Sequence, residues 1–245
     1  MNDTKIVVVT TLYNCENYII KCLESIKSQC YDNFVCYICN DISTDKSVDL
    51  VNDFIKNDNR FILINNTAKL YQGGNYDNVI RNNTNIDDTD IIVEVDGDDW
   101  LPDDTVFNRV MGVYSDKNVW IAYGNFMFLH DNSVGFASPP PDFNNIRRSV
   151  FTASHLRTWR AFLWRHIRQE DLKDGDRGYY KAAPDVSFMW PMLEMAGPEH
   201  FKYMKNINYV YNDMNPLNEP RVCMNEIMRV TELHRYKPSY QKLNL

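Results

Sequence analysis

The chain has 245 residues, of which 44% are apolar and 13% aromatic, so it can bury a substantial hydrophobic core. Its formal net charge is −7, which argues against nucleic acid or an anionic membrane as the main partner, because both attract basic surfaces. The amino-terminal region offers a strand-length apolar run at residues 6–9 but no recognisable signal peptide or transmembrane segment. We therefore expect a soluble, cytoplasmic protein, and the sequence leaves its oligomeric state open.

Strands and helices are predicted to alternate through the first half of the chain. Continuous apolar and β-branched runs predict strands at residues 5–11, 34–39, 61–64, 91–95 and 120–123. Amphipathic spacing predicts helices between them, at residues 18–28, 47–55, 75–81 and 102–113. This alternation is typical of an α/β fold with a mainly parallel central sheet that helices flank.

The pattern changes after Gly124. Three consecutive prolines at residues 139–141 stiffen an excursion of the chain, and the remainder is rich in aromatic residues and arginine. Helices are predicted at residues 156–165, 186–196 and 225–234. We interpret this half as a helical, aromatic lobe that rests on the first half and receives a substrate.

Three carboxylates, Asp96, Asp98 and Asp99, follow the predicted strand at residues 91–95. Carboxylates this close together need a compensating positive charge, and ligands of open α/β sheets bind beyond the carboxyl ends of the strands. Mn²⁺ and Mg²⁺ prefer oxygen ligands and commonly use one or two protein carboxylates. The alternative is an acidic helix start, where negative charge is also favourable; we assign that role to Asp103 and Asp104.

A second group of polar residues lies at positions 155–160. If this segment is helical, His155 and Trp159 share one face, and Arg157 and Arg160 share another. An aromatic ring beside cations suits a sugar ring and a phosphate. A solvated basic helix with a core tryptophan explains the pattern equally well.

In four segments the chain resembles a family 2 glycosyltransferase of the GT-A fold. Residues 9–14 stand where that family has Thr-x-Tyr-Asn, and residues 39–45 stand where it has Asp-Asp-Gly-Ser-x-Asp. Residues 96–99, Asp-Gly-Asp-Asp, match its Asp-x-Asp element, and residues 183–186, Ala-Pro-Asp-Val, precede a helix where it keeps its base. Residues 209–218 also resemble the end of the catalytic region of some members. The chain departs from the pattern at Asn40, which replaces the first Asp of its motif, and in lacking the arginine expected before Asn78.

The resemblance implies a nucleotide-sugar donor, with a UDP-sugar as the default. Thr11, Tyr13 and Asp41 would hold the base and ribose, Tyr13 by stacking and Asp41 by accepting an imide N–H. Lys69 or one of the later arginines would supply the charge of the missing arginine, and Asp96 would contact the ribose or the metal. The same resemblance implies a single catalytic domain over residues 1–245, with a nucleotide-sugar-binding half at 1–124, an acceptor half at 125–214 and a tail at 215–245.

The chemistry that the resemblance implies is an inverting, metal-dependent sugar transfer to a carbohydrate or other hydroxyl acceptor. Asp98 and Asp99 would bind Mn²⁺ or Mg²⁺ on the diphosphate, and Asp185 would be the base. His155, Arg157, Trp159 and Arg160 are the candidates for contacts to the acceptor or the diphosphate.

Two other function classes compete with the transferase. A sugar nucleotidyltransferase also uses carboxylates at a strand end, but it needs a glycine-rich phosphate loop after the first strand, where this chain has residues 12–16 without glycine. A nucleotide-sugar or glycan-binding module would keep the fold without turnover. UDP release from a panel of UDP-sugars, with Mn²⁺ or with EDTA, distinguishes the transferase from the binding module.

Overall fold

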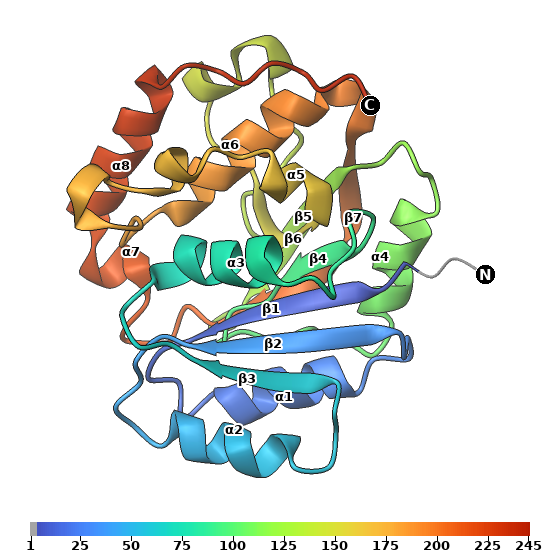
Figure 1. Ribbon diagram of the computed structural model, residues 1–245, viewed down its shortest axis with the longest axis vertical. Coiled ribbons are helices and arrows are strands. Elements are labelled where there is room, and N and C mark those ends of the chain that lie inside the picture. The colour runs from blue at the N-terminus through green and yellow to red at the C-terminus, as the bar shows by residue number, and fades with distance from the viewer. Residues whose placement is uncertain (1–3) are drawn as a thin grey trace.

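The computed structural model describes residues 4–245 and contains one seven-stranded sheet with the strand order β3-β2-β1-β4-β6-β5-β7. Helices cover both faces of this sheet (Figure 1). The strands are β1 (Ile6–Leu12), β2 (Phe34–Asn40), β3 (Phe61–Asn65), β4 (Ile91–Glu94), β5 (Ile121–Phe128), β6 (Ser154–Arg160) and β7 (Phe201–Tyr211). The α-helices are α1 (Ile19–Lys27), α2 (Ser47–Ile55), α3 (Tyr71–Asn82), α4 (Val106–Tyr114), α5 (Ala161–Arg165), α6 (Pro184–Ala196), α7 (Glu219–Val222) and α8 (Met224–Tyr236).

The predicted α/β architecture is confirmed. Strand β1 pairs in parallel with β2 and β4, β2 pairs in parallel with β3, and β5 pairs in parallel with β7. Leu12 lies opposite Asn40, and Asn40 lies opposite Asn65, so these strands end together at one edge. The loops that follow β1, β2, β3 and β4 therefore meet at that carboxyl edge.

Side chains of one strand point alternately to two cores, as the pleat requires. Val7 and Val9 of β1 join the core under α3, α5 and α6, whereas Ile6 and Val8 join the core under α1, α2 and α4. Both strand faces are therefore apolar, which explains the continuous apolar runs in the sequence.

The helix predicted at residues 156–165 is wrong over most of its length. Residues 154–160 form strand β6, and only Ala161–Arg165 are helical, as α5. Strand β6 is antiparallel to both β4 and β5, and Trp159 lies opposite Ile92 on one side and Ile121 on the other. All seven residues of β6 are buried, so backbone pairing with two distant strands outweighs the local helical spacing. Positions 157 and 159 consequently share one face of the sheet, and position 160 faces the other.

Other boundaries differ by less. Helix α3 begins at Tyr71, four residues before the predicted start, so the two glycines at 73 and 74 lie inside it. A Cβ added at Gly74 would lie 2.5 Å from the ring of Tyr179, so close helix packing requires glycine there. The helices predicted at 186–196 and 225–234 are confirmed as α6 and α8. Within the described residues 4–245, no helix is long and apolar enough to cross a membrane.

Candidate functional site at the carboxyl edge

The loop after β4 crosses the end of β1 at very short range. The amide of Gly97 donates to the carbonyl of Thr11 at 3.0 Å. A Cβ added at Gly97 would lie 2.7 Å from that same carbonyl oxygen, so the crossing requires glycine. It brings Asp96 to Thr11, whose hydroxyl donates to Asp96 Oδ1 at 3.1 Å. Two of the predicted site residues therefore lie in direct contact.

Asp98 and Asp99 occupy different environments. Asp99 is only 2% exposed, and its Oδ1 accepts the amide of Asn212 at 2.7 Å. Asp98 Oδ2 accepts from the side-chain amide of Asn215 at 2.6 Å. Burial raises the pKa of both carboxyl groups, and burial together with Asp98 raises the pKa of Asp96 to about 6. Three crowded carboxyl groups that resist ionisation form a donor set that suits a hard cation.

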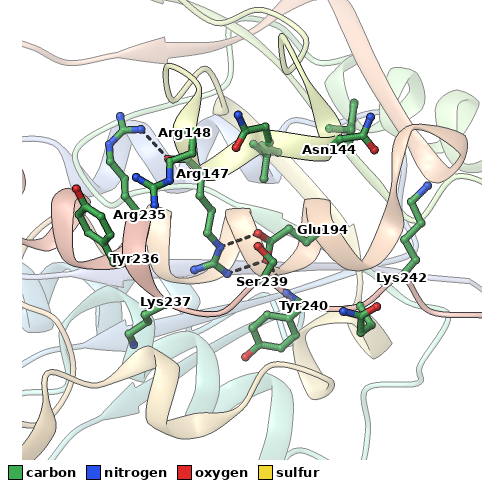
Figure 2. A pocket seen from close by; sticks show the side chains of 14 residues that line it. Asn144, Arg147, Arg148, Glu194, Arg235, Tyr236, Lys237, Ser239, Tyr240 and Lys242 are labelled. Carbon is green, nitrogen blue, oxygen red and sulfur yellow. Dashed lines mark hydrogen bonds and ion pairs between the residues drawn. The ribbon is translucent and has the colours of Figure 1, made fainter.

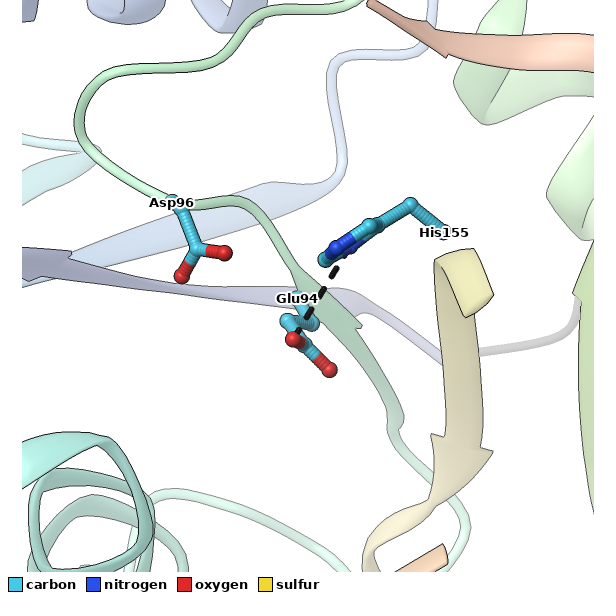
Figure 3. Close-up of side chains that lie close together, drawn as sticks. All are labelled: Glu94, Asp96 and His155. Atoms are coloured by element: carbon cyan, nitrogen blue, oxygen red, sulfur yellow. Dashed lines mark ion pairs between the residues drawn. The ribbon is translucent and has the colours of Figure 1, made fainter. Parts of the chain in front are cut away.

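A second group of possible ligand atoms lies just beneath this loop (Figure 3). One ligand atom from each of Glu94, Asp96 and His155 lies within 4.8 Å of the others. Glu94 Oε2 and His155 Nδ1 are buried without a hydrogen-bond partner in the part of the chain that the structure describes. However, Arg157 Nη1 lies 2.6 Å from Glu94 Oε1, and this guanidinium supplies the positive charge that Glu94 needs. Asp96 belongs to both groups. Because Glu94 is already paired with Arg157, Asp96 and Asp98 fit a divalent cation better than Glu94 does.

The imidazole of His155 is packed between aromatic rings and the acidic loop. Its ring stacks on Tyr209 with centroids 4.3 Å apart, and Nδ1 lies 3.9 Å from Glu94 Oε1. Burial and Arg157 lower the pKa of His155, so the ring is neutral at physiological pH. His155 therefore lies at the site as a neutral aromatic ring, and its Nδ1 has no hydrogen-bond partner among the described residues.

The candidate nucleotide-binding residues also come together. Asp41 accepts the backbone amides of Leu70 at 2.7 Å and Tyr71 at 3.0 Å, which fixes the loop before α3. Lys69 Nζ donates to the Asp41 carbonyl at 3.0 Å and lies 2.9 Å above the ring centre of Tyr13. Tyr13 is 45% exposed, which leaves an aromatic face at the edge of the sheet.

Asp185 lies in the first turn of α6 and points at the same edge. Its Oδ2 lies 2.8 Å from Arg157 Nη2, while Nη1 of the same guanidinium binds Glu94. Arg157 thus links β4, β6 and α6 in one ion-pair chain. The Asp185 carboxylate remains 22% exposed, so it is accessible from outside.

Trp159 and Arg160 do not lie at this edge. Trp159 is fully buried and stacks on Trp164 with centroids 5.8 Å apart. Arg160 donates to the carbonyls of Val119 at 2.8 Å and Tyr114 at 3.2 Å, at the opposite end of β6. The antiparallel direction of β6 puts His155 at the carboxyl edge and Arg160 at the far edge.

Four polar residues of the site were not among the predicted ones. Gln72 donates to Asp96 Oδ1 at 2.9 Å, and Asn212 and Asn215 hold Asp99 and Asp98 as described above. Glu219 Oε2 accepts the amide of Ala183 at 3.0 Å. The asparagine-rich segment at 209–218 was a signal for Asn212 and Asn215; we find no local signal for Gln72 or Glu219.

Glu219 supports the turn that presents Asp185. Ala183 adopts a left-handed conformation with φ 47° and ψ 44°, which is unfavourable for a residue with a Cβ, and its amide donates to Glu219. Burial, together with Asp185 and Asp96, raises the pKa of Glu219 to about 7. The segment after β7 therefore contacts both the acidic loop and the start of α6.

We expect Glu219→Gln to alter the pH dependence of stability. Because the native pKa of about 7 exceeds that of an unfolded glutamate, the native wild-type protein holds an extra proton and loses stability as pH rises through about 7. The glutamine variant lacks this loss. The difference in the free energy of unfolding, variant minus wild type, should therefore rise by about 2–3 kcal/mol from pH 5 to pH 8. Urea unfolding at both pH values measures the difference, and an equal offset at both would contradict the raised pKa.

Comparison with known proteins gives consistent matches. The family model described as Glycosyl transferase family 2 matches residues 7–167. The glycosyltransferase GlyA of Streptococcus pneumoniae serotype 4 (strain ATCC BAA-334 / TIGR4) is 31% identical over 147 residues, covering 55% of this chain and 18% of GlyA. The chain spans 18%, 29% and 52% of the length of three curated relatives that it matches.

Solved structures share the fold at low sequence identity. Residues 1–349 of S. aureus TarS in complex with UDP-GlcNAc superpose with a TM-score of 0.69 at 16% identity, covering 94% of this chain and 66% of that one. The mannosyltransferase PcManGT from Pyrobaculum calidifontis, in complex with GDP-Man and Mn²⁺, gives a TM-score of 0.58 at 17% identity, covering 84% and 56%. The sheet and its flanking helices therefore form a GT-A fold.

Proposed function

Because the chain belongs to glycosyl transferase family 2, we propose that it transfers a sugar from a nucleotide-diphosphate sugar to a hydroxyl acceptor with inversion. A UDP-sugar is the donor that we propose first. The observation that carries the proposal is the meeting of three groups at one sheet edge: the Tyr13–Lys69–Asp41 contacts, the acidic loop with Asp96 and Asp98, and Asp185. The similarity to TarS, solved in complex with UDP-GlcNAc, supports uracil as the nucleobase of the donor. The mannosyltransferase was solved in complex with GDP-Man, so the donor panel should include GDP-sugars.

The proposed nucleobase site is the exposed face of Tyr13 with the loop that Asp41 organises. A carboxylate offers about four acceptor positions. Asp41 uses three of them, for the amides of Leu70, Tyr71 and Asn66. The remaining position, on the oxygen that Lys69 Nζ faces at 3.6 Å, is the one proposed for an imide N–H of the nucleobase. Lys69 is also proposed to supply positive charge beside the phosphates. Thr11 and Asp96 lie next along the edge, at the proposed ribose position.

Asp96 and Asp98 are the proposed first ligands of Mn²⁺ or Mg²⁺, with Asp99 as an additional candidate. A bound divalent cation would neutralise charge on the diphosphate leaving group. Asp99 is committed to the amide of Asn212, so its main proposed contribution is to hold the loop. The amide of Asn215 on Asp98 keeps that carboxylate oriented toward the edge.

Asp185 is the proposed base that accepts the proton of the acceptor hydroxyl. Arg157 fixes the orientation of its carboxylate, and Glu219 fixes the turn before it. Direct attack by the acceptor oxygen on the anomeric carbon, opposite the leaving diphosphate, gives inversion with one carboxylate base. His155 and Arg157 are proposed to line the site and contact the sugar and the diphosphate. Trp159 and Arg160 act as core residues.

Asp98→Asn should weaken metal-dependent UDP binding by about 10- to 100-fold, the cost of removing a charged contact. Calorimetric titration of UDP with Mn²⁺ and with EDTA measures this effect. Asp104→Asn is the matched control, because it removes an exposed carboxylate a few residues along the chain and should keep wild-type affinity. Wild-type, Mn²⁺-dependent affinity in each of Asp96→Asn, Asp98→Asn and Asp99→Asn would rule out the proposed metal site.

The overall function is tested by product analysis with a donor panel. Release of nucleoside diphosphate that EDTA suppresses and an acceptor stimulates supports the transferase. Binding without release across the panel would instead support a binding module, and pyrophosphate formation would support a nucleotidyltransferase. The last outcome is disfavoured because the loop between β1 and α1 has no glycine to approach a phosphate chain.

A further inference from the structure

Figure 2 shows a polar cavity whose lining contains none of the residues of the carboxyl edge. Its volume is about 360 Å³, and it lies between the short helix Phe143–Arg148, the end of α6, the end of α8 and the chain after α8. Glu194, which lines it, follows Asp185 by nine residues on α6. At 1.5 Å per residue, the two positions are roughly 13 Å apart along the helix. This groove is therefore separate from the proposed donor site.

The groove is strongly basic on an otherwise acidic protein. Its lining contains one carboxylate, Glu194, and five cationic residues: Arg147, Arg148, Arg235, Lys237 and Lys242. Arg147 and Glu194 neutralise each other through two contacts of 2.6 and 2.8 Å. The other four cations, Arg148, Arg235, Lys237 and Lys242, differ in how far nearby carboxylates compensate them.

Lys237 and Lys242 have carboxylate partners beside the groove. Lys237 lies 3.1 Å from Asp171, and Lys242 lies 3.0 Å from Glu199. Arg148, by contrast, makes no ion pair with any residue of the described chain, 4–245. Arg235 has only the exposed Glu232 at 3.7 Å. The uncompensated charge therefore comes mainly from Arg148, beside an Arg235 whose one carboxylate partner is long and exposed to solvent.

These two arginines are held next to each other. Arg235 Nη1 donates to the carbonyls of Arg147 at 2.6 Å and Ser149 at 3.0 Å, the residues on either side of Arg148. The guanidinium of Arg148 lies 4.6 Å from the ring centre of Tyr236, the residue after Arg235. Neighbouring guanidinium groups repel each other, and their planar N–H forks match the oxygens of a phosphate.

We propose that this groove binds a phosphate-bearing polyol or sugar, with Arg148 and Arg235 holding the phosphate. Asn144, Ser239 and Gln241 line the rest of the cavity and offer amide and hydroxyl groups to ligand hydroxyls. A volume of about 360 Å³ suits one small ligand of this kind. The site goes beyond the proposed sugar transfer, and it does not depend on which donor the protein uses.

The test is a titration of the isotope-labelled protein with glycerol 3-phosphate, followed by amide chemical shifts. EDTA is present to remove metal-dependent phosphate binding at the carboxyl edge, and glycerol is the neutral probe. We expect saturable shifts in residues 143–148 and 235–242 that salt weakens, with little response to glycerol. Arg148→Gln should weaken binding about tenfold, and Arg148→Lys should weaken it less.

Arg177→Gln is the control, because it removes another exposed arginine charge, outside the groove, and should bind like wild type. Shifts that do not saturate, or equal affinity in Arg148→Gln and Arg177→Gln, would overturn the proposal. Vesicles supply the second arm of the experiment. If the protein sediments with phosphatidylglycerol vesicles in an Arg148-dependent way and shows no response to soluble glycerol 3-phosphate, that result overturns the proposal in favour of binding to a membrane surface.

Discussion

Asp185→Asn should lower kcat for sugar transfer by roughly 10²–10⁴-fold, the usual contribution of a general base. The substitution keeps the size of the side chain and removes only its capacity to take a proton. Arg157, 2.8 Å away, can still donate to the amide oxygen, so the start of α6 should keep its geometry. Nucleoside diphosphate release in the presence of acceptor measures the effect.

The chain offers a closely matched control in Asp174. Asp174 is also paired with an arginine, Arg229, at 2.6 Å, and its side chain is 18% exposed compared with 22% for Asp185. It lies away from the acidic loop, so Asp174→Asn should keep the wild-type kcat. UDP affinity should be the same in both variants, because neither residue touches the proposed nucleotide site.

A folded Asp185→Asn variant with kcat within about tenfold of wild type would exclude Asp185 as the base, given the magnitude expected of one. Glu94 and Glu219 are two other carboxylates close enough to Asp185 to feel its charge. Glu94 is fully buried and paired with Arg157, and Glu219 binds the Ala183 amide. Each would have to break an existing contact in order to accept a proton from an acceptor.

The sequence was sufficient to predict the strands and the site residues where the local pattern and the tertiary structure agree. Strands β1, β2, β3 and β4 have apolar runs that end in polar loops, and parallel pairing places those loops at one edge. The positions of Asp41, Asp96 and Asp98 at that edge follow from this rule alone. Lys69 also lies there, because the loop after β3 must return to the sheet before α3.

Strand β6 could not be predicted in the same way, because its conformation is decided by distant partners. Its residues His155 to Arg160 include two arginines and a histidine, which is an unusual composition for a central strand. Both arginines are buried against specific partners that lie far along the chain: Arg157 contacts Glu94, which is 63 residues away, and Arg160 contacts the carbonyl of Val119, which is 41 residues away. The polar and aromatic residues at positions 155–160 are spaced three and four apart, as on a helix, although the segment is a strand.

The same limit explains the missed residues. Asn215 is 117 residues from Asp98, and Glu219 is 36 residues from Ala183. Single polar residues in an irregular segment have no periodicity that could indicate these contacts. Their function emerges only when the segment after β7 folds back over the carboxyl edge, where it connects the proposed metal loop to the proposed base.

Arg157 connects the stability of this region to its chemistry. Above about pH 8, where Glu94 is ionised, Arg157→Met should destabilise the fold by about 3–5 kcal/mol, as expected when a buried ion pair loses one partner. Glu94 is fully buried, and burial raises its pKa to about 8 while Arg157 opposes the rise. Because the native pKa lies above the unfolded value, stability falls as pH rises through this range. The destabilisation that Arg157→Met causes should be small near pH 5, where Glu94 is protonated, and largest above pH 8. Urea unfolding at both pH values measures it.

The double variant Arg157→Met with Glu94→Gln separates the two roles of Arg157. Removing both charges removes the cause of the instability, so the double variant should regain most of the stability and lose the pH dependence. Its kcat should stay low, because Asp185 still lacks the guanidinium that orients it. If kcat returns together with stability, Arg157 only supports the fold, and the orientation of Asp185 must come from Glu219 and the turn at Ala183. If neither returns, Glu94 itself contributes to the site through the carboxylate oxygen that lies beside His155.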